Sequence, residues 1–144
     1  MDAEKTLAQL RQFLLIISAG IFVMTVAELI FLEHWNFTIQ YLPFALIVLG
    51  LAASGLAYFR PSRGVIRFAQ WSMIGIAVVS LIGFYQHMAG NYTFWLEIVP
   101  DATPWELIVE TFKGGVPVLA PGILTLGGVI GWAATYKHPS LETK

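Results

Sequence analysis

Four ionisable side chains that can bind a proton, an ion or a ligand lie within or beside apolar stretches of the sequence: Glu28, Glu33, His34 and His87. Glu28 lies inside a long apolar segment, where an ionisable group suggests function because burying its charge is costly. Counted along two helices that rise from the same side, Glu28 and His87 fall within about 5 Å of the same depth. A carboxylate and an imidazole that meet there would each favour the charged form of the other. We therefore expect Glu28 and His87 to pair, as a structural contact or as an ion or proton site.

The two histidines also permit metal chemistry. His34 and His87 can hold a haem iron between two helices, and imidazole with carboxylate suits zinc, copper or iron. Glu33 and His34 are neighbours, and neighbours on a helix do not share a face, so both can join one site only where the helix has ended. The sequence has no cysteine and no H-x-x-x-H or E-x-x-H spacing. We therefore expect no cofactor, with a haem or a transition metal as the alternative.

The composition indicates that these residues lie in a membrane. Hydrophobic residues make up 57% of the chain and charged residues 12%, whereas a soluble domain carries about 25% charged residues. A helix needs about 20 apolar residues to cross a bilayer core. Four segments meet this length, and we expect one domain over residues 1–144, with spans at 13–33, 39–59, 66–87 and 116–136 and a loop at 88–115. The predicted fold class is all-α, an integral membrane four-helix bundle.

The lysines and arginines are unequally divided between the two ends of these spans. All of the 8 except Lys113 precede span one, lie between spans two and three or at the very start of span three, or follow span four. Positively charged loops remain in the cytoplasm, so we expect both termini there and the 88–115 loop outside. The predicted location is the cell membrane, plasma or inner, with the lipid bilayer as a partner. These charges serve topology, and no basic patch beyond them indicates nucleic acid.

The outer loop contains one predicted amphipathic helix. Thr103 and Glu106 have the spacing of a capping box, Pro104 suits the first helical position, and Gly114-Gly115 suits the end. We expect this helix to lie on the membrane surface or to cap the bundle. Its apolar face would be buried there, formed by residues at helical spacing: Trp105, Ile108, Val109 and Phe112.

Small and polar residues indicate which helix faces meet inside the bundle. Gly127 and Gly131 form a G-x-x-x-G pattern in span four, and Gly50 and Ser54 lie on one side of span two. Helices in lipid pack through such residues, so we expect close contacts within the bundle, with homodimerisation as the alternative. Lipid cannot satisfy polar groups, and two stripes should therefore face inward: Ser18, Thr25 and Glu28 in span one, and Gln70, Ser80 and His87 in span three.

Three functions are compatible with these features. The first is a non-enzymatic membrane-embedded subunit or accessory protein of a larger membrane complex, with a membrane-protein partner or as a homo-oligomer. The second is a small oligomeric transporter or channel with a proton- or cation-sensitive site at Glu28 and His87, in which Pro121 kinks span four as a hinge. The third is a haem- or metal-binding redox carrier that uses His34 and His87. No nucleophile–base pair is evident, so an enzyme is not expected.

Overall fold

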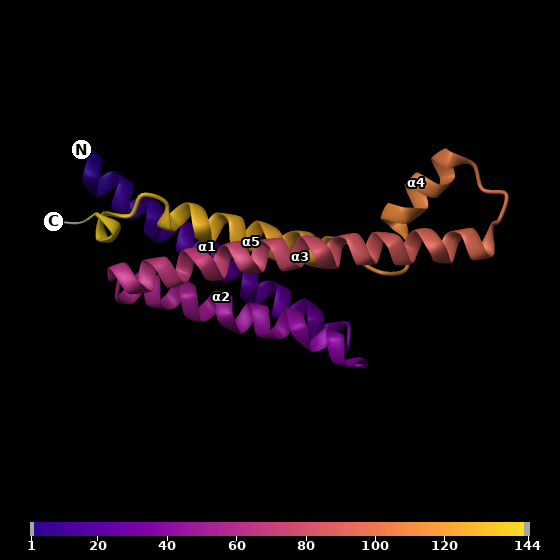
Figure 1. Cartoon of the computed structure of the whole chain (residues 1–144), viewed down its shortest axis with the longest axis horizontal. Helices are drawn as coiled ribbons and strands as arrows, with labels where there is room; N and C mark the ends of the chain where they lie inside the picture. The colour runs from indigo at the N-terminus through magenta and orange to yellow at the C-terminus, as the bar shows by residue number, and fades with distance from the viewer. Residues whose placement is uncertain (1, 143–144) are drawn as a thin grey trace.

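The computed structural model describes residues 2–142, which are helical and contain no strand (Figure 1). Helices α1, α2, α3 and α5 run along the long axis of the molecule, and the two termini lie at the same end. Three of the helices are long and apolar enough to cross a membrane: α1, η1 with α2, and α3. Helix α5 is a shorter apolar helix. The elements are α1 Ala3–Phe31, η1 Thr38–Tyr41, α2 Leu42–Phe59, α3 Arg63–Ile98, α4 Pro104–Lys113, α5 Leu119–Thr135 and η2 Pro139–Leu141.

Helix α3 is longer than the sequence pattern predicts. It has 36 residues and ends at Ile98, so the first part of the expected 88–115 loop is helical. The hydropathy of the sequence falls near residue 87, which is why we expected the helix to end there. No proline interrupts the backbone before Pro100, and the residue that precedes a proline is disfavoured in a helix, so α3 continues to Ile98. The end of α3 therefore projects beyond the other long helices and carries α4 beside it (Figure 1).

Helix α5 begins at Leu119, later than the expected start of span four at residue 116. Pro121 therefore falls in the first turn of α5, where its missing N–H would in any case have no partner within the helix. The helix therefore accommodates Pro121 without the kink that we expected at this residue.

Helix α4 has the predicted capping box, because the Thr103 side chain accepts from the Glu106 N–H and the Glu106 carboxylate accepts from the Thr103 N–H. Its contact with α3 is made by a different face from the expected one. Thr111 is buried, whereas the side chains of Trp105, Ile108 and Phe112 are 71%, 53% and 53% exposed. Residues 2–142 therefore leave most of the predicted apolar face uncovered, with Val109 alone half-buried.

The glycines of α5 lie against the backbones and side chains of two neighbouring helices. A Cβ atom added at Gly128 would lie 2.7 Å from the carbonyl oxygen of Met73 in α3, and one at Gly127 would lie 3.0 Å from the Ile21 side chain in α1. The Ser18 hydroxyl of α1 donates to the carbonyl oxygen of Gly127 at 2.8 Å. A Cβ at Gly131 would meet the Met73 sulfur at 2.6 Å. Gly127, Gly128 and Gly131 therefore lie in close contact with α1 and α3 within this chain.

Span two packs through the small residues named above. A Cβ at Gly50 would collide with the ring of Phe22, which is fully buried. Ser54 is 2% exposed, and its hydroxyl has no hydrogen-bond partner among residues 2–142.

The two polar stripes face inward as predicted. Ser18, Thr25 and Ser80 are buried, and the Gln70 side chain donates to the carbonyl oxygen of Thr135 in α5 at 3.0 Å. Glu28 is half-buried at the edge of its stripe.

Gly128→Ala should destabilise the bundle, because the added methyl group must displace the backbone of α3 around Met73. We expect a loss of about 1–3 kcal/mol, the usual cost of overpacking, measured as the thermal or denaturant stability of the purified protein. Gly75→Ala is the matched control, since nothing lies within 4 Å of its added Cβ. Equal effects of the two substitutions would contradict the packing of α5 on α3.

Candidate functional site

A cavity of about 680 Å³ lies between the end of α1, the start of α2, the middle of α3 and the start of α5. Its polar lining groups include His34 at the α1–α2 turn and Ser80 and His87 on α3. Most of the wall is apolar, with contributions from Leu29, Leu32, Leu42, Leu46, Val79, Ile82, Val116, Pro117, Ala120, Pro121 and Leu124. The volume lies within the range of about 300–1,000 Å³ that small-molecule and cofactor sites occupy.

His34 and His87 both line this cavity, and their rings lie close together. Their ring centroids are 6.4 Å apart, with an angle of 51° between the ring planes. Both side chains are half-buried. Burial, with a smaller contribution from His87, lowers the pKa of His34 below its ordinary value. The lowered pKa favours the neutral imidazole, which keeps a nitrogen lone pair.

The end of α1 places His34 at this position. Glu33 has a positive φ of 49°, which reverses the chain direction. The N–H of Glu33 donates to the carbonyl oxygen of Ile30 at 3.1 Å, and the N–H of His34 donates to that of Leu29 at 3.0 Å. These two bonds form a Schellman motif, which satisfies the last carbonyl groups of the helix. The motif brings His34 back over the end of α1.

His87 is fixed by a hydrogen bond to the start of the last helix. Its Nδ1 lies 2.7 Å from the carbonyl oxygen of Pro117. A carbonyl oxygen only accepts hydrogen bonds, so Nδ1 carries the proton and Nε2 is left for a ligand. Residue 121 is a proline and has no N–H to offer this carbonyl group from one turn further along. A histidine that donates its second nitrogen to a backbone carbonyl is the usual arrangement at a metal site.

Asn91 holds the same segment of chain one helical turn further along α3. Its Nδ2 donates to the carbonyl oxygens of Thr111 at 3.1 Å and Val116 at 2.9 Å, and its Oδ1 accepts from the Val116 N–H at 3.0 Å. Asn91 is 2% exposed. A Cβ at Gly114 would lie 2.5 Å from the Asn91 side chain. The absence of a side chain at Gly114 therefore leaves space for Asn91. The φ of Gly114 is −54°, outside the left-handed region that glycine favours, so backbone conformation does not require a glycine at this position.

Ser80 contributes a hydroxyl group that has no hydrogen-bond partner in the part of the chain that the structure describes. The side chain lines the cavity and is 4% exposed, and its Oγ makes no hydrogen bond among residues 2–142. A buried hydroxyl without a partner costs about 1–3 kcal/mol. The cavity therefore offers an unused polar atom as well as two imidazoles.

The structure brings His87 together with His34 and not with Glu28. The side chains of α1 that line the cavity are Leu29 and Leu32, and Glu28 is not among the lining residues. Glu33 is exposed on the turn and does not line the cavity either. The four predicted site residues therefore divide into a pair of histidines in the cavity and two carboxylates outside it.

Sequence reasoning missed Asn91 and Pro117, and it gave the pairing of the two histidines only as the alternative to a pairing of His87 with Glu28. The spacing of His87 and Asn91 at i and i+4 on the polar stripe of α3 is a signal for Asn91. No sequence pattern shows the Pro117 carbonyl group, because it is a main-chain atom 30 residues from His87.

Asn91→Leu should loosen the connection between α4 and α5, because two carbonyl groups and one N–H lose their partner in a buried place. We expect a cost of about 1–3 kcal/mol and faster amide hydrogen exchange over residues 111–118, measured by mass spectrometry. The control is Asn36→Leu, since Asn36 is exposed and makes one bond, to the Glu33 carbonyl oxygen. Unchanged exchange in Asn91→Leu would contradict the role of these bonds.

Comparison with known proteins does not identify a relative of this chain. The chain matches no protein-family model, no curated protein and no solved structure.

Proposed function

We propose that this chain is a non-enzymatic, membrane-embedded subunit that binds a haem-like group between His34 and His87. The observation that carries the proposal is the pair of imidazoles 6.4 Å apart at a largely apolar cavity. Two imidazoles on opposite sides of one metal ion place their ring centroids about 6 Å apart, because each metal–nitrogen bond is about 2.0 Å long.

The number of protein ligands favours a haem over a bare metal ion. Among residues 2–142, no group of three or more His, Cys, Asp or Glu side chains is placed to hold a metal ion. A metal ion between His34 and His87 must therefore receive most of its ligands from a prosthetic group, as a haem iron does from the porphyrin. The apolar wall suits a flat lipophilic ring. When bound, such an iron exchanges single electrons, which requires no nucleophile or base from the protein.

The exposed side chains support membrane insertion. Large apolar residues on all four long helices are open on the surface, including Met24 at 71%, Val48 at 67%, Trp71 at 73% and Leu119 at 70%. Soluble monomers rarely expose so large an apolar surface. We propose that lipid covers it, that α1, α2, α3 and α5 all cross the cell membrane, and that Arg60, Arg63 and both termini lie in the cytoplasm.

The uncovered face of α4 supports membership of a larger assembly. Helix α3 extends for about 54 Å, well beyond a bilayer core of about 30 Å, and α4 packs beside its projecting end. The hydrogen bond from Asn91 to Thr111 holds the C-terminal end of α4 against α3. The exposed side chains of Trp105, Ile108 and Phe112 therefore lie on a fixed surface. We propose that a membrane-protein partner covers this face on the outer side.

The transporter alternative has less support from the geometry. It needs Glu28 and His87 at one site, and the cavity that contains His87 does not include Glu28. Pro121 lies in the first turn of α5 and supplies no hinge in the middle of a span.

Addition of haemin to the purified protein should give the absorbance spectrum of an iron with two histidine ligands. His34→Ala and His87→Ala should each abolish this spectrum and weaken binding at least about tenfold, since loss of even supporting groups at metal sites costs about 10–100-fold. His138→Ala is the matched control. His138 is the third of the 3 histidines in the chain and does not line this cavity.

Two outcomes would contradict the haem proposal. One is a wild-type protein that gives no such spectrum. The other is a spectrum that survives in both His34→Ala and His87→Ala, or that is lost equally in His138→Ala.

Cysteine labelling tests the proposed orientation in the membrane. The sequence has no cysteine, so a single one introduced at an exposed position gives no background. Asp101→Cys, before α4, should react with a membrane-impermeant maleimide in intact cells or spheroplasts, and Ser62→Cys, before α3, should react only after permeabilisation. The reverse pattern would place the termini outside.

A further inference from the structure

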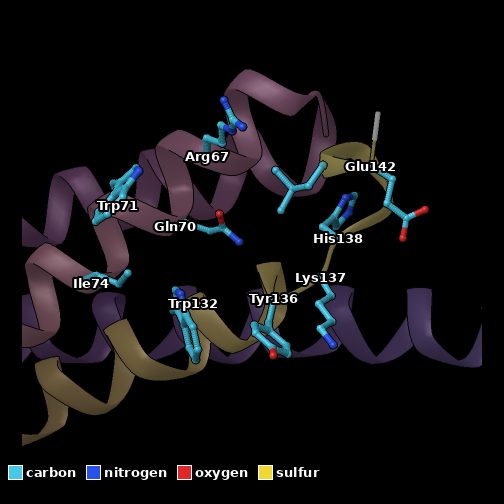
Figure 2. Close-up of a pocket in the computed structure, with 10 residues that line it drawn as sticks. Arg67, Gln70, Trp71, Ile74, Trp132, Tyr136, Lys137, His138 and Glu142 are labelled. Carbon is cyan, nitrogen blue, oxygen red and sulfur yellow. The ribbon is translucent and has the colours of Figure 1, made fainter. Parts of the chain in front are cut away.

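A second hollow lies at the end of the molecule that contains the termini. It has a volume of about 700 Å³ and is formed by the first half of α3, the end of α5 and the segment that follows α5. Figure 2 shows Trp71, Ile74 and Trp132 at one end of this hollow, and Lys137, His138 and Glu142 at the other. The hollow is thus aromatic and apolar at one end and charged at the other.

The change from charged to apolar follows the helix axes. On α3, Arg67, Trp71 and Ile74 succeed one another at i, i+4 and i+7, so they lie on one face and span about 10 Å. On the opposite wall, Lys137 is the second residue after the end of α5, and Trp132 lies inside the helix, just over one turn before Lys137. Trp71 is 73% exposed. Both walls therefore carry a cation at the membrane surface and an indole about one turn deeper, where tryptophan is enriched at bilayer interfaces.

The negative end of α5 does not oppose an anion in this hollow. The carbonyl groups at a helix C-terminus carry partial negative charge, but two of those here are already bonded. Gln70 Nε2 donates to the carbonyl oxygen of Thr135 at 3.0 Å, and the Thr135 hydroxyl donates to that of Trp132 at 2.8 Å. Beyond the helix, the Arg11 guanidinium donates to the carbonyl oxygen of Lys137 at 2.9 Å. Figure 2 shows Gln70 reaching from α3 toward the end of α5.

The backbone of Lys137 is also unusual. Its φ is 45°, in the left-handed region that residues other than glycine and asparagine rarely adopt. The ammonium group lies 5.6 Å from the centre of the Tyr136 ring. A lysine at a position that suits glycine suggests that its side chain is used.

We propose that this hollow binds an anionic phospholipid of the cytoplasmic leaflet, with the phosphate at Arg67 and Lys137 and the acyl chains along Trp71, Ile74 and Trp132. The proposal rests on the membrane orientation given above and is independent of what binds at His34 and His87. A basic pocket between helices at the cytoplasmic surface is a recognised form of lipid headgroup site. Among residues 2–142, Glu142 is the one carboxylate in the lining, and it weakens the attraction for a phosphate.

His138 adds little positive charge to the hollow at neutral pH. Burial, and then the charge of Arg11, lower the pKa of His138 below its ordinary value. Its Nδ1 accepts a hydrogen bond from the Ser140 N–H at 3.2 Å. The phosphate is therefore attracted by Arg67 and Lys137.

Native mass spectrometry of the detergent-solubilised protein with added lipid tests the proposal. Phosphatidylglycerol should bind more tightly than phosphatidylcholine, and glycerol phosphate, which lacks acyl chains, should not compete. Arg67→Gln and Lys137→Asn should each weaken phosphatidylglycerol binding about fivefold, since each cation near an anionic lipid surface contributes about that factor. Asparagine tolerates the left-handed backbone at position 137. Glu142→Gln should strengthen binding.

Arg60→Gln and Arg63→Gln are the controls, because they remove cations from the same end of the molecule without touching the lining. Equal losses in these controls would mean that general surface charge, and not this hollow, attracts the lipid. Equal binding of the two lipids, or competition by glycerol phosphate, would also overturn the proposal. None of these outcomes depends on haemin binding, and an inverted cysteine-labelling pattern would change the leaflet without removing the site.

Discussion

The backbone contact of α5 with α1 and α3 determines where the rest of the structure can open. At Gly128 the helices approach so closely that even a methyl group would meet the Met73 carbonyl oxygen at 2.7 Å. Toward the start of α5 the contacts loosen, and an added Cβ at Gly122 would be 3.8 Å from the Phe84 ring. Leu124 and Ala120 follow on the buried face, and both line the histidine cavity. The cavity thus begins where the glycine contacts end, and the hollow lined by Trp71 and Lys137 lies beyond their other end.

The sequence predicts the helical framework well because apolar length, capping and small residues are local signals. The capping box at Thr103 and Glu106 and the close packing at Gly127 and Gly131 are both present. The end of α3 could not be predicted in the same way. Hydropathy shows where apolar residues stop, whereas a helix stops where its backbone is interrupted, here before Pro100.

The candidate site was only partly predictable, because its geometry depends on main-chain atoms and on a bend. His34 reaches the cavity because Glu33 adopts a left-handed conformation, which no glycine or asparagine signals. His87 is oriented by the carbonyl oxygen of Pro117. Equal depth along two helices suggested that Glu28 was the partner of His87, but depth does not give the angular position around the helix axis, and Leu29 faces the cavity instead.

The continuity of α3 makes it a rigid lever that passes both binding regions. One unbroken helix of 36 residues carries Arg67 near its first end, His87 past its middle and Asn91 beside α4. A rod of about 54 Å that pivots at its tight contact with Gly128 moves its two ends in opposite directions, and the longer outer arm moves further. A small tilt at the first end of α3 is thereby enlarged at α4. A molecule in contact with Trp105 and Phe112 would therefore be displaced by a change in packing at the opposite end of the helix.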